Sequence, residues 1–275
     1  MVGRREGRGE ERPVPPIITL TTDFGLRDPF VGIMKGVLLS ICPSARLVDL
    51  THEGPPQDIL AGGLALEAAT PFFPPGTVHL AVVDPGVGSA RRAIAVRAGG
   101  YYLVGPDNGL FTFALEGAGW TAVSVTAPEY RLAEVSRTFH GRDVFAPAAA
   151  YLAAGVPLER LGPAVSDPER LRRPGCRLEG GELVGEVLAA DRFGNLITSI
   201  PAARLAEIPG PGGVALEVAG RRLRGPVGAY AEGGDGEPAV IVGSTGRLEI
   251  FVRAGSARDN LGAGRGAIVR VRRAE

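Results

Sequence analysis

Short apolar runs alternate with longer segments of helical periodicity through the first half of the chain. The runs are rich in β-branched residues, as buried strands are, and they occupy residues 17–22, 46–50, 78–83, 93–98 and 101–105. Between them the apolar spacing predicts helices over 29–41, 58–73, 109–116 and 142–155. Strands that alternate with helices predict an α/β domain with a mostly parallel central sheet, covered by helices on both faces.

The pattern changes after residue 155. Four prolines between residues 156 and 180 mark a domain boundary, because such segments are loop-like and exposed. Beyond them, short alternating strands are separated by Gly-rich turns and no helix exceeds two turns, which predicts a small antiparallel β-barrel or sandwich. The predicted organisation is a disordered tail over 1–16, an α/β domain over 17–160, a linker over 161–179 and a β-barrel domain over 180–275.

Composition narrows the classes of partner. Thirty basic and thirty acidic residues cancel, and the body of the chain has no Lys/Arg cluster, which argues against nucleic acid or an anionic membrane and favours a small molecule. Cys42 and Cys176 lie far apart without CxxC spacing, so two reduced thiols are expected rather than a disulfide or a zinc site. No apolar stretch reaches the roughly 20 residues of a membrane span, and the N-terminal segment lacks a signal-peptide core, so a cytoplasmic protein is expected.

Three loops follow the first three predicted strands, where ligands bind in parallel α/β sheets. The first contains Asp23, which can either accept the two hydroxyls of a ribose or cap the following turn. The third, "VDPGVGSARR", places Asp84 and Arg91 seven positions apart, and it lacks the GK[ST] of a nucleotide-triphosphate loop. A pair of opposite charges at a strand end therefore needs another explanation.

The three histidines share no metal-binding spacing. His79 lies inside a predicted strand and is expected to be a packed side chain. His52 follows a strand end, where it can cap a loop. His140 precedes a glycine and a helix start, which suits proton chemistry or anion binding as well as a purely structural role.

Two turns in the second half carry further candidates. In "DRFGNLIT", a hairpin turn explains Gly194 and Asn195, since both tolerate positive φ, but it leaves the ring of Phe193 without an apolar partner. The segment "GSTG", residues 243–246, is either a tight turn or a backbone nest for a carboxylate.

Six motifs in one order resemble those of a known family. They are "ITLTTDFGLRDPFVGIMKGVLLSICP", "VDLTHEGPPQDI", "VVDPGVGSARR", "GPDNGLFT", "FHGRDVFAPAAAYLAAG" and "DRFGNLIT". From Ile17 to Val269 the chain resembles the S-adenosyl-L-methionine hydroxide adenosyltransferases, which are relatives of the fluorinases and chlorinases.

The resemblance implies a two-domain subunit, α/β then β-barrel, in a homotrimer that holds S-adenosyl-L-methionine (SAM) between one subunit's first domain and its neighbour's second domain. It implies hydrolysis of SAM to adenosine and L-methionine by water or hydroxide that attacks C5′ of the ribose. It also implies that Asp84, Arg91 and His140 form a catalytic triad that holds the attacking oxygen.

The same resemblance assigns substrate contacts. Asp23 would hold the ribose hydroxyls, and Asp191 would pair with the methionine ammonium. Asn195 would hydrogen-bond the adenine edge, while Phe193 and Tyr230 would supply aromatic surface around the base.

Four positions differ from the halide-using relatives. Ser244 would help bind the methionine carboxylate, but Thr245 stands where those relatives have an arginine. Asp84 replaces a tyrosine, and His140 followed by Gly141 replaces a tyrosine followed by a serine. A carboxylate would repel a halide ion, so water is the expected nucleophile.

Two alternative functions are weighed against hydrolysis. A non-catalytic sensor of SAM or adenosine would have lost the triad, which this chain retains. A halide-dependent adenosyltransferase would carry the missing tyrosine and serine.

The chemistry implied by the resemblance calls for no metal and no cofactor beyond SAM as substrate. The leaving group is a neutral thioether, so only the attacking oxygen needs help with a proton. With an ordinary pKa of about 6.5, His140 is the natural proton acceptor. The resulting hypothesis is that His140 takes the proton, Arg91 steadies the oxygen and Asp84 fixes the geometry.

Overall fold

The computed structural model describes residues 14–210 and 212–274. They form two compact units, divided between Leu171 and Arg172, and each unit has its own sheet and its own apolar core. The division falls inside the predicted linker, whose bounds stay a prediction. Residues 1–13 of the predicted tail lie outside the described residues.

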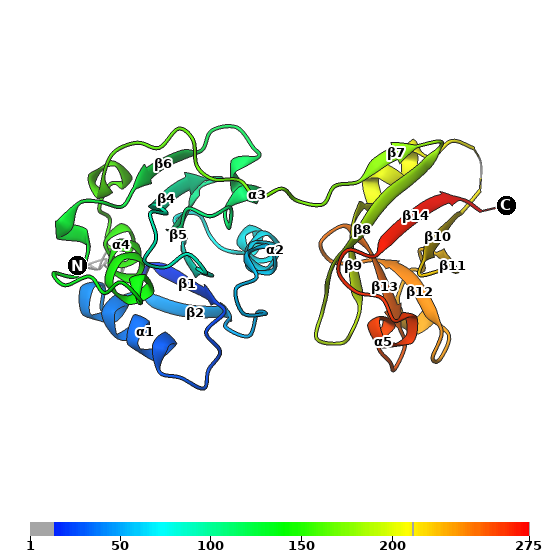
Figure 1. The fold of residues 1–275 in the computed structure, drawn as a ribbon, viewed down its shortest axis with the longest axis horizontal. Helices are drawn as coiled ribbons and strands as arrows, with labels where there is room; N and C mark the ends of the chain where they lie inside the picture. The colour runs from blue at the N-terminus through cyan, green and yellow to red at the C-terminus, as the bar shows by residue number, and fades with distance from the viewer. Residues whose placement is uncertain (1–13, 211, 275) are drawn as a thin grey trace, which may run out of the picture. The chain divides into compact units, whose positions relative to one another are not determined.

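The first unit contains a six-stranded sheet in the order β2-β1-β3-β5-β4-β6 (Figure 1). Its strands are β1 (Ile17–Thr22), β2 (Arg46–Thr51), β3 (Val78–Val82), β4 (Ala93–Ala98), β5 (Tyr101–Pro106) and β6 (Thr121–Ser124). β1, β2, β3 and β5 run parallel, whereas β4 is antiparallel to β5 and to β6. The mostly parallel sheet is confirmed, and β6, four residues long, is the strand that the apolar pattern missed.

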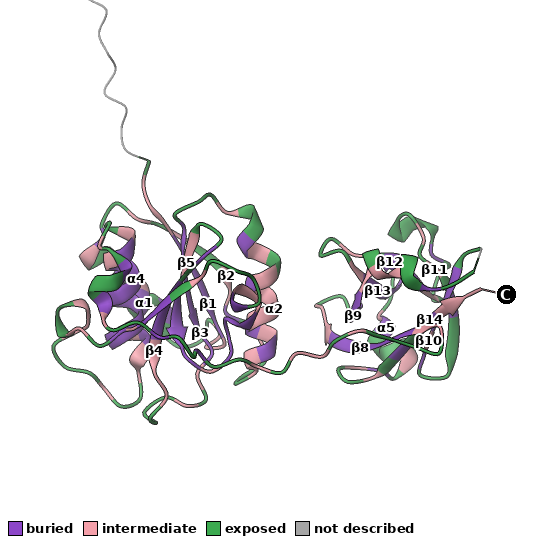
Figure 2. Cartoon of the chain, turned by 90° about the horizontal axis from the view of Figure 1, so that it is seen from above, coloured by how far each residue is buried: buried purple, intermediate pink, exposed green. Residues whose placement is uncertain are grey.

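Helices cover both faces of this sheet, as Figure 2 shows by the burial of the strands between them. One face packs against α1 (Phe30–Ile41) and α4 (Ala146–Ala153) through residues such as Met34 and Leu38. The other packs against α2 (Ile59–Ala69) and α3 (Thr112–Leu115). Shorter turns are η1 (Thr70–Phe72), η2 (Pro128–Tyr130), η3 (Gly141–Phe145) and η4 (Leu158–Leu161).

The predicted helix over 142–155 differs in its first turn. Residues 141–145 form the π-helical turn η3, and α-helical geometry begins at Ala146. Pro147 cannot donate a backbone hydrogen bond and sits in the first turn of α4. Turns of π-helix inside helices recur at functional sites.

The second unit is an antiparallel barrel that is nearly closed, which confirms the predicted fold. Its strands run in the order β11-β10-β14-β8-β9-β13-β12, and β7 adds to β8. Their bounds are β7 (Arg177–Glu179), β8 (Glu182–Ala190), β9 (Leu196–Pro201), β10 (Val214–Val218), β11 (Arg221–Gly225), β12 (Pro238–Val242), β13 (Arg247–Val252) and β14 (Ile268–Arg273). The segment after β11 returns to β12, where Val227 N donates to Val240 O at 2.8 Å.

Short helical turns connect the barrel strands. They are η5 (Ala202–Glu207), η6 (Tyr230–Glu232) and α5 (Ala257–Leu261), so the expectation of no long helix in this half holds for the described residues. The strand β11 was not predicted, because its side chains are mostly arginines and only Leu223 is buried.

Gly105 tests the packing between β3 and β5. A Cβ added there would lie 2.2 Å from Ala81 O and 2.9 Å from the Phe111 ring. The Ala81 oxygen belongs to the backbone of β3, so relieving this clash would require the strand itself to shift. Gly105→Ala should therefore lower the free energy of unfolding by about 1–3 kcal/mol, measured by urea denaturation. The control Gly36→Ala, in α1 with nothing within 4 Å of the new Cβ, should be neutral or stabilising. Equal effects of the two substitutions would contradict this packing.

Candidate functional site

A buried ion pair lies beyond the carboxyl end of β3. Arg91 donates from Nε to Asp84 Oδ1 at 2.9 Å and Oδ2 at 3.1 Å, and from Nη2 to Oδ2 at 2.5 Å. The two side chains are only 9% and 5% exposed. A charge this deeply buried needs a partner, because removing an ion from water is costly unless an opposite charge and hydrogen bonds replace the water.

His140 completes a three-residue cluster. Arg91 Nη2 lies 2.7 Å from His140 Nδ1. A guanidinium only donates hydrogen bonds, so Nδ1 must accept and the neutral ring carries its proton on Nε2. The predicted triad of Asp84, Arg91 and His140 is therefore brought together by the fold.

The environment of His140 favours the neutral ring. Burial is the main cause that lowers its pKa below the ordinary value, and the positive charge of Arg91 adds to it. The carboxylates of Asp84 and Asp143 act in the opposite direction without reversing the shift. The neutral imidazole is thus favoured over the imidazolium.

Backbone geometry explains how distant segments meet. Gly88 has φ +78, and a Cβ there would lie 2.5 Å from Arg137 O, so only glycine allows the loop after β3 to approach the segment before His140. From η3, Phe145 places its ring 5.1 Å from the Arg91 guanidinium carbon. This cation–π contact holds the guanidinium from the side.

Asp23 joins two of the predicted loops. Its Oδ2 accepts a hydrogen bond of 2.6 Å from Gln57 N, in the loop after β2, so it does not cap its own turn. Gln57 adopts φ +65, a conformation that non-glycine residues rarely take. Oδ1 has no hydrogen-bond partner within residues 14–210 and 212–274, which leaves it for an external donor.

The other two histidines serve structure. His79 is fully buried in β3, where Nδ1 bonds Thr19 Oγ1 at 2.8 Å and burial lowers its pKa to about 4. His52 is buried beside β1, with Nδ1 2.8 Å from Thr22 Oγ1. The prediction of a packed His79 is confirmed, and His52 ties the loop after β2 to the end of β1.

In the barrel unit, Asp191 organises the turn between β8 and β9. Its Oδ1 accepts from Phe193 N at 2.8 Å and Asn195 N at 2.9 Å, and its Oδ2 accepts from Asn195 Nδ2 at 2.9 Å. One of the two N–H groups on Asn195 Nδ2 is thereby used, and Oδ1 is left as an acceptor without a partner in the described part of the chain. The Phe193 ring is 75% exposed, as an aromatic surface for a ligand would be.

Tyr230, Ser244 and Thr245 lie on two further segments of the barrel unit. Tyr230 is 47% exposed, and its hydroxyl donates to Glu249 Oε1 at 2.6 Å. This bond, together with burial and the charges of Glu249 and Asp191, raises the Tyr230 pKa to about 12. Ser244 and Thr245 are exposed in the turn between β12 and β13, which Gly243 O closes by accepting from Gly246 N at 2.9 Å.

Some site residues carry no sequence signal of their own. Gln57 donates a hydrogen bond to Asp23 from its backbone N–H, which no side-chain pattern indicates. Phe145 has the sequence pattern of a helix core residue, and Glu249 lies in an otherwise apolar strand. Only the last could have been found, as a single acid among apolar neighbours in "RLEIFV".

Among residues 14–210 and 212–274, no group of three or more His, Cys, Asp or Glu side chains is placed to hold a metal ion. No helix in these ranges is long and apolar enough to cross a membrane. The expectation of metal-free chemistry stays a prediction.

Comparison with known proteins identifies the relatives of both units. The family model of the SAM hydroxide adenosyltransferase N-terminal domain matches residues 18–162, and that of the C-terminal domain matches residues 185–270. An (R)-S-adenosyl-L-methionine hydrolase from Thermus thermophilus is 47% identical over 91% of this chain and 97% of its own length. A fluorinase from Actinopolyspora mzabensis is 32% identical over 94% of this chain and 97% of its own length.

A solved structure supports the same relationship. The crystal structure of an uncharacterised conserved protein from Thermotoga maritima is 36% identical, with a TM-score of 0.86 over 93% of this chain and all of the other. The family resemblance found in the six motifs is confirmed.

The titration of His140 tests the cluster directly. Its pKa, measured by NMR of the ring protons, should lie below about 6.5 in the wild type. Asp84→Asn should lower it further, because the carboxylate favours the imidazolium form. His79, with its pKa of about 4, is an internal control that should not respond. A rise in the His140 pKa on Asp84→Asn would contradict the arrangement.

Proposed function

The chain belongs to the S-adenosyl-L-methionine hydroxide adenosyltransferase family, and on that premise we propose that it hydrolyses SAM to adenosine and L-methionine. The observation that carries the proposal is the cluster in which Arg91 bonds both the Asp84 carboxylate and the His140 imidazole. We propose that this cluster holds the attacking oxygen. The Thermus thermophilus relative is named for the (R) form of SAM, which supports the (R) epimer at sulfur as the preferred substrate.

The reaction is a single displacement at carbon. An oxygen derived from water forms a bond to C5′, the C5′–S bond breaks with its electron pair going to sulfur, and one proton is released. The charges of hydroxide and sulfonium cancel as the bond forms, so a site that excludes bulk water favours the transition state. The neutral thioether leaves as methionine without needing an acid.

The tautomer of His140 favours a different role for this residue than that of proton acceptor. Nδ1 accepts from Arg91, so the ring offers Nε2–H as a donor and has no second free lone pair for the proton of water. We therefore assign His140 the role of a hydroxide-holding donor beside Arg91, in place of the proton acceptor expected from its ordinary pKa. The proton goes to solvent, and Asp84 keeps Arg91 oriented and charge-balanced.

Halide chemistry is disfavoured by the same cluster. The carboxylate of Asp84 lies within hydrogen-bond distance of the Arg91 guanidinium and neutralises the positive charge that a halide ion would need. A hydroxide can donate a hydrogen bond to a carboxylate, whereas a halide cannot.

The substrate contacts follow from the free groups of each segment. Asp23 keeps Oδ1 for a ribose hydroxyl, and Asn195 keeps Oδ1 for the exocyclic amino group of adenine, which is a donor. Phe193 and Tyr230 offer aromatic surface to the base. Asp191 would pair with the methionine ammonium, while Ser244 and Thr245 would bind its carboxylate.

Assembly, location and cofactors belong to the same proposal. The enzyme would act as a homotrimer with sites at subunit interfaces, in the cytoplasm, without a cofactor and without nucleic-acid or membrane partners. The net charge of zero and the family relationship support this assignment.

Product analysis tests the proposed function. Pure protein incubated with an epimeric mixture of SAM should release adenosine and methionine, consume the (R) epimer faster and retain its activity in EDTA. Added chloride or fluoride should yield no 5′-halogenated nucleoside. A halogenated product would establish the halide-dependent enzyme, and tight binding of unchanged SAM would establish a sensor.

Variants of His140 test its role as a donor. Wild-type kcat should fall as pH drops through the lowered His140 pKa, because the imidazolium would turn a second N–H against Arg91. His140→Gln can accept from Arg91 and donate to the oxygen, so it should lose about 10-fold and lack this acidic limb, whereas His140→Ala should lose about 100-fold or more.

The two variants also separate chemistry from folding. Both should bind adenosine as the wild type does, measured by calorimetry. A glutamine variant as inactive as the alanine variant would show that His140 accepts the proton instead.

A further inference from the structure

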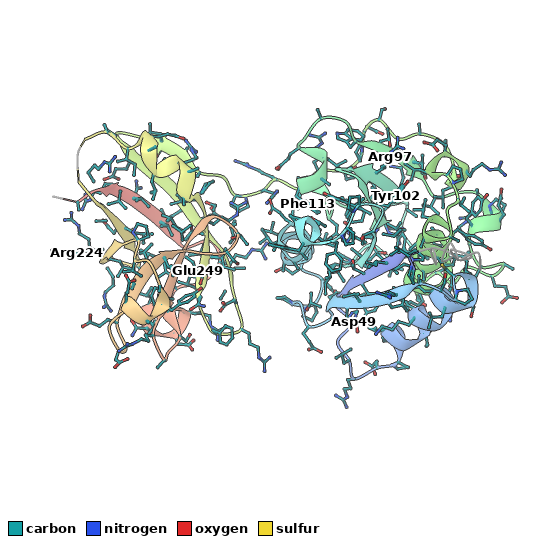
Figure 3. All side chains as sticks on the ribbon, turned by 180° about the vertical axis from the view of Figure 1, so that it is seen from behind. Asp49, Arg97, Tyr102, Phe113, Arg224 and Glu249 are labelled. Atoms are coloured by element: carbon teal, nitrogen blue, oxygen red, sulfur yellow. The ribbon has the colours of Figure 1, made fainter. Side chains whose placement is uncertain are left out.

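The outer face of β13 holds one segment of the barrel unit in place. Side chains alternate along a strand, and Leu248, Ile250 and Val252 point into the apolar core. Glu249 and Phe251, and Arg253 just after the strand, therefore point the other way, toward the segment 227–236 that contains η6. Figure 3 labels Glu249 among the strands of this unit.

Each of these three side chains contacts the segment. Glu249 Oε1 accepts from the Tyr230 hydroxyl at 2.6 Å, and the Phe251 ring meets the Tyr230 ring edge to face with centroids 4.8 Å apart. Arg253 donates to Ala231 O at 3.2 Å and to Asp235 Oδ1 at 2.7 Å. Tyr230 is thus held at its hydroxyl and at its ring, while the backbone beside it is fixed separately.

Glu249 is unusual among these anchors. It is 8% exposed, and its hydrogen-bond partner within residues 14–210 and 212–274 is a neutral phenol, the hydroxyl of Tyr230. Its second oxygen, Oε2, lies 2.6 Å from the position that a Cβ on Gly243 would take. A buried acid without a cation is destabilising unless hydrogen bonds compensate, so its place between Tyr230 and the 243–246 turn calls for a role other than packing.

We propose that Glu249 is a positioning residue that fixes Tyr230 as the aromatic platform for the substrate's base. The inference rests on the proposed function, because it takes adenine as the ligand of this surface. With its hydroxyl committed to Glu249, the phenol cannot donate to a base and presents only its ring. The close approach of Oε2 to Gly243 sets the neighbouring turn against the same carboxylate.

A positioning role makes a distinct kinetic prediction. Tyr230 would act on the base and not on C5′, so loss of Glu249 should weaken binding and spare the chemical step. Glu249→Leu should raise KM and the Kd of adenosine about 10-fold, within the range of one base–aromatic stacking contact, and leave kcat within about 2-fold. Glu249→Gln keeps an oxygen that accepts from Tyr230 and should change both by less than about 3-fold.

Two further variants test whether Glu249 affects adenosine binding through Tyr230. Tyr230→Phe removes the same hydrogen bond, so Tyr230→Phe combined with Glu249→Leu should bind adenosine no worse than Glu249→Leu alone. Glu217→Gln is the matched control, a partly exposed carboxylate on β10 that lies 3.8 Å from Arg272, and it should leave all constants unchanged.

The outcomes separate this inference from the proposed function. Wild-type protein that neither binds adenosine nor consumes SAM defeats the proposed function before any variant is made. Active wild type with unchanged adenosine binding in Glu249→Leu, a loss confined to kcat, or additive effects of the Tyr230 and Glu249 changes would overturn the positioning role. If Glu249→Leu fails to fold, weaker adenosine binding in Tyr230→Phe with near-normal binding in Glu249→Gln supports it, and the reverse order overturns it.

Discussion

The buried ion pair between Asp84 and Arg91 is the interaction on which the candidate site depends. Without Asp84, a guanidinium that is 9% exposed would lack a counter-charge, and without Arg91 the carboxylate would be equally costly. The pair also sets the state of His140, because Arg91 can only donate and so requires an acceptor at Nδ1. One electrostatic constraint thereby fixes an orientation and a tautomer, while burial is the main cause of the lowered His140 pKa.

The α/β architecture determines where this ion pair lies, and a glycine allows the loop that carries it to come close to the segment before His140. β3 ends at Val82, in the middle of the sheet, so the following loop begins at the edge where parallel strands present their ligands. The loop then reaches the segment before His140 only because Gly88 carries no side chain against Arg137 O. Packing and backbone freedom thus come before electrostatics in building the cluster.

The apolar pattern predicts most of the strands and helices, and the family resemblance points to the triad. Neither indicates contacts made by backbone atoms or by side chains that look like core residues. The period of apolar residues is a local property, so β1 and β4 were located to the residue. The role of Gln57 depends on its φ and on a backbone donor, which no side-chain pattern encodes. The tautomer of His140 depends on a neighbour 49 positions away, so the ordinary pKa alone could not show that Nδ1 is taken up by Arg91.

The site side chains of the two units are held in position by different interactions. The triad is held by charge inside the α/β unit, where low exposure strengthens each interaction and makes an unpaired group costly. In the barrel unit, the rings of Phe193 and Tyr230 are largely exposed, so hydrogen bonds to their backbone or hydroxyl contribute to their positioning, and the Tyr230 ring also packs edge to face on Phe251. Asp191 closes the turn under Phe193 with backbone bonds, and Glu249 anchors Tyr230 by its hydroxyl. Because each carboxylate bonds a backbone N–H or a hydroxyl and not a ring face, much of both rings stays exposed for a flat ligand.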